Sequence, residues 1–97
     1  MSERGKSPHP ELWCDFNARM TERGYRPTKG TVEGLAALGI TLEDAVGRPF
    51  VLVSDDADDQ GNPDDIMHNG TVVRDSKLGV LLEVDGTGFY WRSELRN

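Results

Sequence analysis

The chain has 97 residues, and its 17 Asp and Glu against 11 Lys and Arg give a formal net charge of −6. A chain of this length forms one domain and can bury a core without metal or disulfide staples. The single cysteine, Cys14, excludes an internal disulfide framework and a Cys-rich zinc site, and it favours a reducing compartment. The first residues lack the apolar segment of a signal peptide, and no apolar run is long enough to cross a membrane. We therefore expect a cytoplasmic protein without membrane contact.

The charge is distributed unevenly along the chain. Residues 1–30 carry six basic and four acidic side chains, net +2, whereas residues 31–97 carry five basic and thirteen acidic side chains, net −8. Six of those thirteen acids fall between Asp55 and Asp65. Asp, Asn, Gly and Pro disfavour regular structure, and clustered carboxylates repel one another. The segment 55–65 is therefore predicted to be a loop.

Residues 1–7 are too polar to pack and are predicted to be a disordered leader. A helix over residues 10–23 is indicated by Pro10 in its first turn, by an apolar stripe at helical spacing and by Gly24 beyond its end. The members of the stripe are Leu12, Trp13, Phe16 and Met20. On this helix Cys14 is predicted to be a partly buried, inert filler beside the stripe.

Two shorter helices are predicted before residue 48. Apolar side chains at helical spacing indicate a helix over residues 31–38, which Gly39 ends. Thr41 and Asp44 have the spacing of a capping box, and Gly47 follows soon after, so a helix of about one turn is expected over residues 41–46.

From Arg48 onward the pattern is typical of strands, with β-branched and aromatic residues between Gly, Asp and Asn. Asn69-Gly70 is interpreted as a bulge within the second strand, and residues 85–88 as a tight hairpin turn. Residues 91–95 are predicted to form a final helical turn. The predicted strands cover residues 50–53, 66–74, 80–84 and 89–91.

These elements predict an α+β fold in a single domain over residues 8–97. Its helical part, 8–47, is expected to pack on a strongly bent antiparallel sheet of four to five strands, or on a small barrel, over residues 48–95. The order of these strands resembles that of Src-homology-3-like barrels, as an architecture over residues 48–97. No motif of that family is matched, so the resemblance implies no functional residues. The rival fold is a winged helix, because residues 31–41 resemble the second helix and turn of such DNA-binding proteins.

The acidic loop partly follows the ligand spacing of an EF-hand calcium loop when Gly61 is set at position six. Met67 then stands at position twelve, where a bidentate Glu is required, so no EF-hand is predicted. A weak divalent-cation site remains an alternative hypothesis. Its candidate ligands are Asp56, Asp58, Gln60, Asn62 and Asp64.

Near the end of the chain, Phe89 and Trp91 are expected to pack into the core and Tyr90 to be exposed beside Arg92, as at contact surfaces. His68 by itself makes neither a catalytic triad nor a metal site. Our candidates for contact with a partner are Asp55, Asp56, Asp58, Asp59, Asp64, Asp65, Tyr90 and Arg92.

The sequence therefore predicts a small acidic, non-enzymatic binding or regulatory module that contacts a basic protein partner through the loop 55–65 and the adjacent sheet. No catalytic motif, cofactor or metal is expected, and nucleic acid is not expected as a partner, because a half-chain of net −8 repels phosphates. A second hypothesis is an acidic mimic of nucleic acid that inhibits a DNA- or RNA-binding protein, as small phage or mobile-element inhibitors can. A third hypothesis is an enzyme of unrecognised type, which would need a pocket that collects His68, acids and Arg74 or Arg92. A loop that binds a divalent cation and a winged helix that binds DNA are further alternatives.

Overall fold

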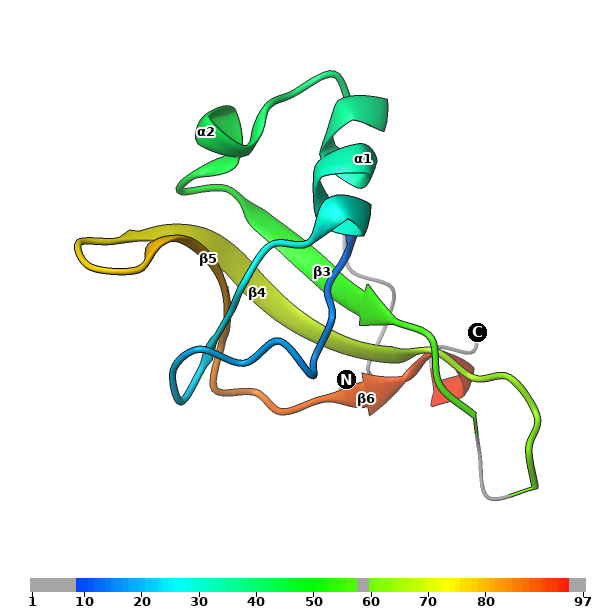
Figure 1. Cartoon of the computed structure of the whole chain (residues 1–97). Helices are drawn as coiled ribbons and strands as arrows, with labels where there is room; N and C mark the ends of the chain where they lie inside the picture. Colours follow the sequence, from blue (N-terminus) through cyan, green and yellow to red (C-terminus); the bar gives the residue numbers. More distant parts are fainter. Residues whose placement is uncertain (1–8, 58–59, 95–97) are drawn as a thin grey trace, which may run out of the picture.

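A computed structural model describes residues 9–57 and 60–94 of the chain. The predicted leader at residues 1–7 lies outside this range. The described residues form a small α+β protein with two helices and one mixed sheet (Figure 1). In chain order the elements are β1 (Glu11–Trp13), β2 (Gly24–Tyr25), α1 (Lys29–Ala37), α2 (Leu42–Ala45), β3 (Pro49–Ser54), β4 (Ile66–Asp75), β5 (Gly79–Val84), β6 (Tyr90–Trp91) and the 3-10 turn η1 (Arg92–Glu94).

The strand β4 is the centre of the sheet. Its residues 66–71 pair with β3, its residues 70–75 pair with β5, and Ile66 and Met67 pair with β6, in each case antiparallel. The strand order is β1-β3-β4-β5-β2, with β6 beside β4 off this path. Because β1 and β2 lie at opposite ends of that order, the sheet is open, and the predicted barrel is wrong. The sheet is also mixed and not wholly antiparallel, since β1 runs parallel to β3.

The predicted helix over residues 10–23 is wrong. The segment instead forms β1, a series of turns and β2. Leu12 and Cys14 are both buried, at 1% and 0% exposure, which is the two-residue alternation of a strand, whereas Met20 is 44% exposed. The Cys14 amide donates to the Val53 carbonyl at 2.9 Å, so the chain gains sheet hydrogen bonds in place of helical ones.

Side chains in the turns of this segment also compete with a helix. The Asp15 carboxylate accepts from the Asn17 amide at 2.9 Å, and the Thr21 hydroxyl accepts from the Gly24 amide at 2.7 Å. Asp and Thr side chains that bond nearby amides stabilise turns at the expense of the helical pattern. Gly24 thus marks the start of β2 and not the end of a helix.

The two short helices are confirmed. Helix α1 spans Lys29–Ala37 and α2 spans Leu42–Ala45, close to the predicted 31–38 and 41–46. The predicted capping box is present, because the Asp44 amide donates to the Thr41 hydroxyl at 3.1 Å and the Thr41 amide donates to the Asp44 carboxylate at 3.3 Å. These bonds hold the pKa of Asp44 below its ordinary value. Helix α1 is tied to β1 by the Thr31 hydroxyl, which donates to the Trp13 carbonyl at 2.8 Å.

The strands after residue 48 agree with the predicted positions, and η1 confirms a helical turn within residues 91–95. Two details are wrong. The pairing of β4 with β3 and β5 runs through Asn69 and Gly70 without a skipped residue, so there is no bulge. Residues 85–88 are not a hairpin turn, because β5 and β6 both pair with the same strand, β4, and not with each other.

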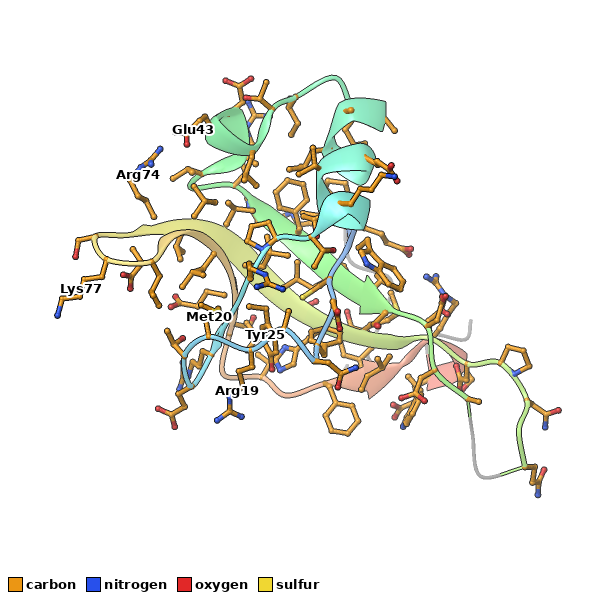
Figure 2. The ribbon with its side chains drawn as sticks, viewed as in Figure 1. Arg19, Met20, Tyr25, Glu43, Arg74 and Lys77 are labelled. Carbon is orange, nitrogen blue, oxygen red and sulfur yellow. The ribbon has the colours of Figure 1, made fainter. Side chains whose placement is uncertain are left out.

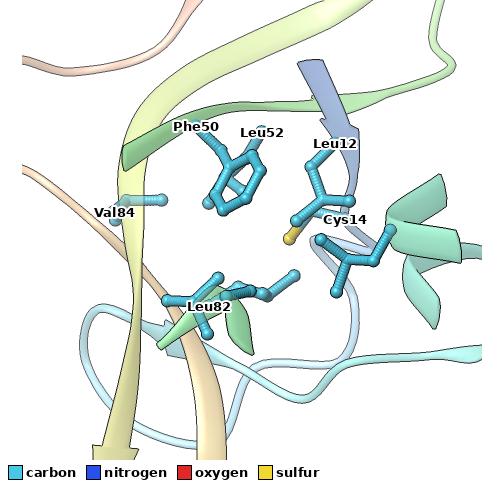
Figure 3. Packing of buried hydrophobic residues seen from close by; sticks show 9 residues of the cluster. Leu12, Cys14, Phe50, Leu52, Leu82 and Val84 are labelled. Atoms are coloured by element: carbon cyan, nitrogen blue, oxygen red, sulfur yellow. The ribbon is translucent and has the colours of Figure 1, made fainter. Parts of the chain in front are cut away.

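The main core lies where α1 and α2 meet the sheet (Figure 3). Its residues come from β1 and the residue after it, from both helices and from β3, β4 and β5: Leu12, Cys14, Leu35, Ala45, Phe50, Leu52, Val72, Leu82 and Val84. A second cluster joins β3, β4 and β6 and consists of Val51, Val53, Met67 and Tyr90. Strand β3 alternates between the two clusters, so both of its faces are buried. Neither of the helices within the described range is long and apolar enough to cross a membrane.

Gly70 lies where the sheet leaves no room for a side chain. A Cβ at this position would lie 2.5 Å from the Glu83 carbonyl oxygen and 2.8 Å from Cδ1 of Leu52. We expect Gly70→Ala to lower the free energy of unfolding by about 2 kcal/mol, because backbone and core must both move to admit the methyl group. Chemical denaturation would measure the loss.

The control for this change is Gly86→Ala. A Cβ at Gly86 would meet only the Arg23 guanidinium at the ordinary distance of 3.9 Å. This variant is expected to remain within about 0.5 kcal/mol of the parent protein. If both variants lost the same free energy of unfolding, the lack of space for a side chain at Gly70 would be contradicted.

Candidate functional site

The acidic loop connects β3 to β4 and projects from the body of the protein (Figure 1). Its stem is paired: Ala57 and Pro63 form an antiparallel bridge, and the Asp64 amide donates to the Asp56 carbonyl at 3.0 Å. Asp55 and Asp56 are exposed on one side of this stem. Asp58 and Asp59, which are also among the predicted partner contacts, lie outside the described residues.

The other side of the stem is bonded to the turn η1. The Asp64 carboxylate accepts from the Ser93 amide at 3.0 Å and from the Ser93 hydroxyl at 2.7 Å. The Asp65 carbonyl accepts from the Arg92 amide at 2.9 Å. Asp64 and Asp65 therefore hold the base of the loop against the end of the described chain, whereas Asp55 and Asp56 do not share this role.

Arg92 binds two carboxylates from distant parts of the sequence. Its Nε donates to Asp65 at 2.8 Å, and its two terminal nitrogens donate to the two carboxylate oxygens of Glu11 at 2.7 and 3.0 Å. The hydrogen bonds to Glu11 and Asp65 raise the pKa of Arg92 above its already high value. The guanidinium thus joins β1, the base of the loop and η1, and its charge is matched inside the molecule.

Tyr90 does not lie on a contact surface, so the predicted orientation of residues 89–91 is wrong. Tyr90 is 3% exposed and packs with Met67, its partner in the β4–β6 pairing, while its hydroxyl donates to the Asn69 side chain at 2.8 Å. Phe89, which was expected in the core, is 56% exposed. Pairing with β4 determines which side chains of this two-residue strand face inward.

Two of the candidate cation ligands, Asp56 and Asp64, already accept hydrogen bonds within the fold. One Asp56 oxygen accepts from the Ala57 amide at 2.8 Å, and both Asp64 oxygens accept from Ser93. Gln60 and Asn62 lie beyond the bridged stem, and Asp58 is outside the described range. Among the described residues there is no group of three or more His, Cys, Asp or Glu side chains that could hold a metal ion.

Cys14 is a core residue. It is fully buried and packs in the main core. Burial, together with the neighbouring charge of Asp15, raises the pKa of its thiol to about 12. A thiol that is neutral and shielded from solvent is a poor nucleophile.

A small apolar pocket lies between the segment 14–28 and the start of β4, and the sequence did not predict it. It has a volume of about 130 Å³ and is lined by Phe16, Tyr25, Ile66, His68 and Phe89. These residues come from three separate segments, and Phe16 had been assigned to the helical stripe. No local sequence signal brings them together.

His68 forms one wall of this pocket and is partly buried. Its burial lowers the pKa of the imidazole below the ordinary value of 6.5, and the Asn69 carbonyl and the Asp85 charge oppose this shift less strongly. Burial therefore disfavours the imidazolium form of His68 in this pocket.

The bridging role of Arg92 can be tested with Arg92→Lys, because a single ammonium group cannot reproduce three bonds in a fixed fork. We expect a loss of about 1 kcal/mol, seen as a fall of about 5 °C in Tm. The matched control is Arg74→Lys. It makes the same change in the ion pair Arg74–Glu43, which is more exposed than the ion pairs of Arg92. Equal Tm values for the two variants would contradict a bridging role for Arg92.

The lowered pKa of His68 predicts a pH dependence of stability. The unfolded chain binds a proton at higher pH than the folded chain, so the free energy of unfolding decreases as pH falls below the ordinary value of 6.5. His68→Gln should flatten the dependence of Tm on pH between about pH 8 and about pH 5.5. A variant profile as steep as that of the parent would contradict this cause.

No protein-family model, no curated protein and no solved structure matches this chain. No residue role is transferred from a relative, and the roles assigned above come from the contacts, burial and charges of this chain's own side chains.

Proposed function

We propose that this chain is a small non-enzymatic binding module that contacts the basic surface of a protein partner through its acidic loop. The observation that carries the proposal is the division of the loop into two sides. Asp64 and Asp65 are bonded to η1 and fix the stem, whereas Asp55 and Asp56 are exposed and form no ion pair with any described residue. The loop thus holds exposed negative charge on a braced support.

The distribution of charge over the molecule supports the same function. Figure 2 shows Arg74 and Lys77 at the end of the molecule opposite the acidic loop, and Arg19 on the segment that joins β1 to β2. Arg74 is paired there with Glu43, so its charge is offset within the molecule. Exposed charge of one sign attracts an approaching partner of opposite sign and increases the rate of encounters. The exposed carboxylates of the loop would therefore steer a basic partner toward the loop.

The chemistry of the titratable groups favours binding over catalysis. The Cys14 thiol is sealed in the core with a pKa raised to about 12, and His68 forms a wall of an apolar pocket. The ring nitrogen Nδ1 of His68 lies 3.3 Å from the Asn69 carbonyl oxygen, and Asp85 acts on the imidazole through its charge. A general base needs a hydrogen bond to the proton that it removes, and His68 is instead turned toward a backbone carbonyl.

The hypotheses of a nucleic-acid mimic, a winged helix and a cation-binding loop have less support. A nucleic-acid mimic needs carboxylates spread over a surface at phosphate-like spacing, but Asp64 and Asp65 are used within the fold. A winged helix needs a reading helix, but α2 has four residues and β3 begins at Pro49. A cation-binding loop needs converging ligands, but Asp56 already accepts from the Ala57 amide and Asp64 from Ser93.

The proposal predicts that Asp55→Asn combined with Asp56→Asn weakens binding to a lysine-rich peptide about fivefold, because two exposed ion pairs contribute about 0.5 kcal/mol each. Tm should stay equal or rise, since repulsion within the loop decreases. Binding should also weaken as salt is raised toward about 0.15 M. Isothermal titration at several salt concentrations measures both effects.

The matched control is Glu22→Gln combined with Glu83→Gln, which removes the same number of charges at exposed positions elsewhere. This variant is expected to bind as the parent protein does. If the loop variant bound unchanged, or if both variants lost affinity equally, the loop would not be the contact surface.

A further inference from the structure

The apolar pocket beside the acidic loop is bounded by aromatic rings that are already held in place. Phe16 and Tyr25 make an edge-to-face pair, with ring centroids 5.2 Å apart and planes at 88°. Phe89 makes a similar pair with Trp91, at 6.2 Å and 84°. Such pairs are stabilising beyond their buried area, so the rings need little ordering when a ligand arrives.

Phe89 is the exposed edge of this pocket. Its side chain is 56% exposed although it is one of only three phenylalanines in the chain. Aromatic residues that border a pocket at the surface are enriched among the residues that contribute most to protein–protein binding. The exposed ring beside a preformed pocket therefore indicates a contact point for a partner side chain.

The size of the pocket limits what can occupy it. Its volume of about 130 Å³ is well below the roughly 300 Å³ at which small-molecule sites begin, and close to the roughly 150 Å³ of a cavity that holds benzene. A single side chain such as leucine or methionine fits this range.

The chemistry of the walls decides between an apolar and a charged occupant. The lining residues include no carboxylate that could pair with an ammonium group, and His68 forms the polar wall beside the Tyr25 ring. Burying a charge without a partner is costly, whereas burying an aliphatic side chain is favourable. An apolar side chain is therefore the better occupant.

The position of the pocket connects it to the acidic loop. Ile66 lines the pocket and follows Asp65 directly, and Asp64 lies two residues before it, or about 7 Å along an extended chain. The Asp64 amide is bonded in turn to the Asp56 carbonyl. Basic residues that flank an apolar side chain in this pocket would thus lie within reach of the loop carboxylates.

We infer that the pocket receives one apolar side chain of leucine or methionine size from the same basic segment of the partner that the acidic loop attracts. The inference rests on the proposed function and adds a sequence requirement for the partner, namely an apolar residue flanked by Lys or Arg. The loop supplies the charge complementarity, and the pocket selects among basic segments.

Three capped peptides test the inference by NMR titration of the parent protein: Lys-Lys-Leu-Lys-Lys, Lys-Lys-Ser-Lys-Lys and Lys-Lys-Lys-Lys-Lys. The leucine peptide is expected to shift the amide signals of Asp55 and Asp56 and the side-chain signals of Ile66, His68 and Phe89. The other two are expected to shift only the loop signals and to bind about tenfold more weakly, since they bury no apolar side chain in the pocket.

A pair of variants locates the effect. Phe89→Ala removes the exposed wall of the pocket and should abolish the preference for leucine while leaving the loop shifts in place. Leu78→Ala is the control, because Leu78 is similarly exposed, at 45%, but lies in the turn between β4 and β5. That variant should keep the full preference. Because Phe89 is more than half exposed, its truncation leaves the core intact, which dispersed amide signals would verify.

The outcomes separate the pocket from the loop. Equal affinities of the leucine and serine peptides, with shifts confined to the loop, would overturn the pocket inference and leave the proposed function standing. Pocket shifts with the all-lysine peptide would overturn the apolar occupant in favour of a cation held by the rings. Loop signals that stay unmoved by every peptide would contradict the proposed function itself.

Discussion

The tight packing of β4 against β5 at Gly70 is the constraint on which the rest of the structure depends. Strand β3 pairs with β4 as far as Thr71, and β5 pairs with β4 from Gly70 onward, so the two partners overlap only at Gly70 and Thr71. The edge of β4 before Gly70 is thereby left to β6, which pairs with Ile66 and Met67. Since β6 leads directly into η1, this arrangement brings Arg92 and Ser93 against the base of the acidic loop. A side chain at position 70 would separate the strands that make this possible.

The bonding of the loop base separates two roles that the sequence could not distinguish. The acidic residues of the loop look equivalent when they are read in order, because each stands in the same polar setting. In the folded chain Asp64 and Asp65 accept hydrogen bonds from η1, and the Arg92 guanidinium offsets the charge of Asp65. The repulsion that remains is concentrated at the exposed carboxylates, where solvent screens it. Clustered charge can therefore be kept for binding with a limited cost in stability.

Local signals predicted the parts of the fold that depend on local chemistry. The capping box at Thr41 and Asp44, the β-branched runs of β3 to β5 and the polar loop all formed where they were expected. The segment 10–23 did not, because its strand forms only by parallel pairing with β3, about 40 residues later in the chain. Pro10 and Gly24 are compatible with a helix and equally with a strand between turns, so the nonlocal pairing decided the outcome.

The candidate site was harder to predict than the fold for the same reason. Arg92 is 81 residues from Glu11, and no sequence spacing indicates that contact. The alternation at residues 89–91 was recognised, but its direction depends on which residue of β6 meets Met67, and that placed Tyr90 inside and Phe89 outside. The pocket needs three segments at once, so it could not be predicted before the sheet was known.

A loop of carboxylates by itself would discriminate poorly among basic partners. Charge attraction acts over distances near the Debye length and depends little on which basic residues supply it, so it raises the encounter rate more than it selects a sequence. Selection needs short-range contacts that a wrong partner cannot make. In this chain a feature of this kind is the pocket between Phe16, Tyr25 and Phe89, whose rings are already ordered by their own pairing. The braced loop and the preformed pocket lie at the same end of β4, so one partner segment can meet both, and the geometry of β4 fixes the spacing that such a segment must match.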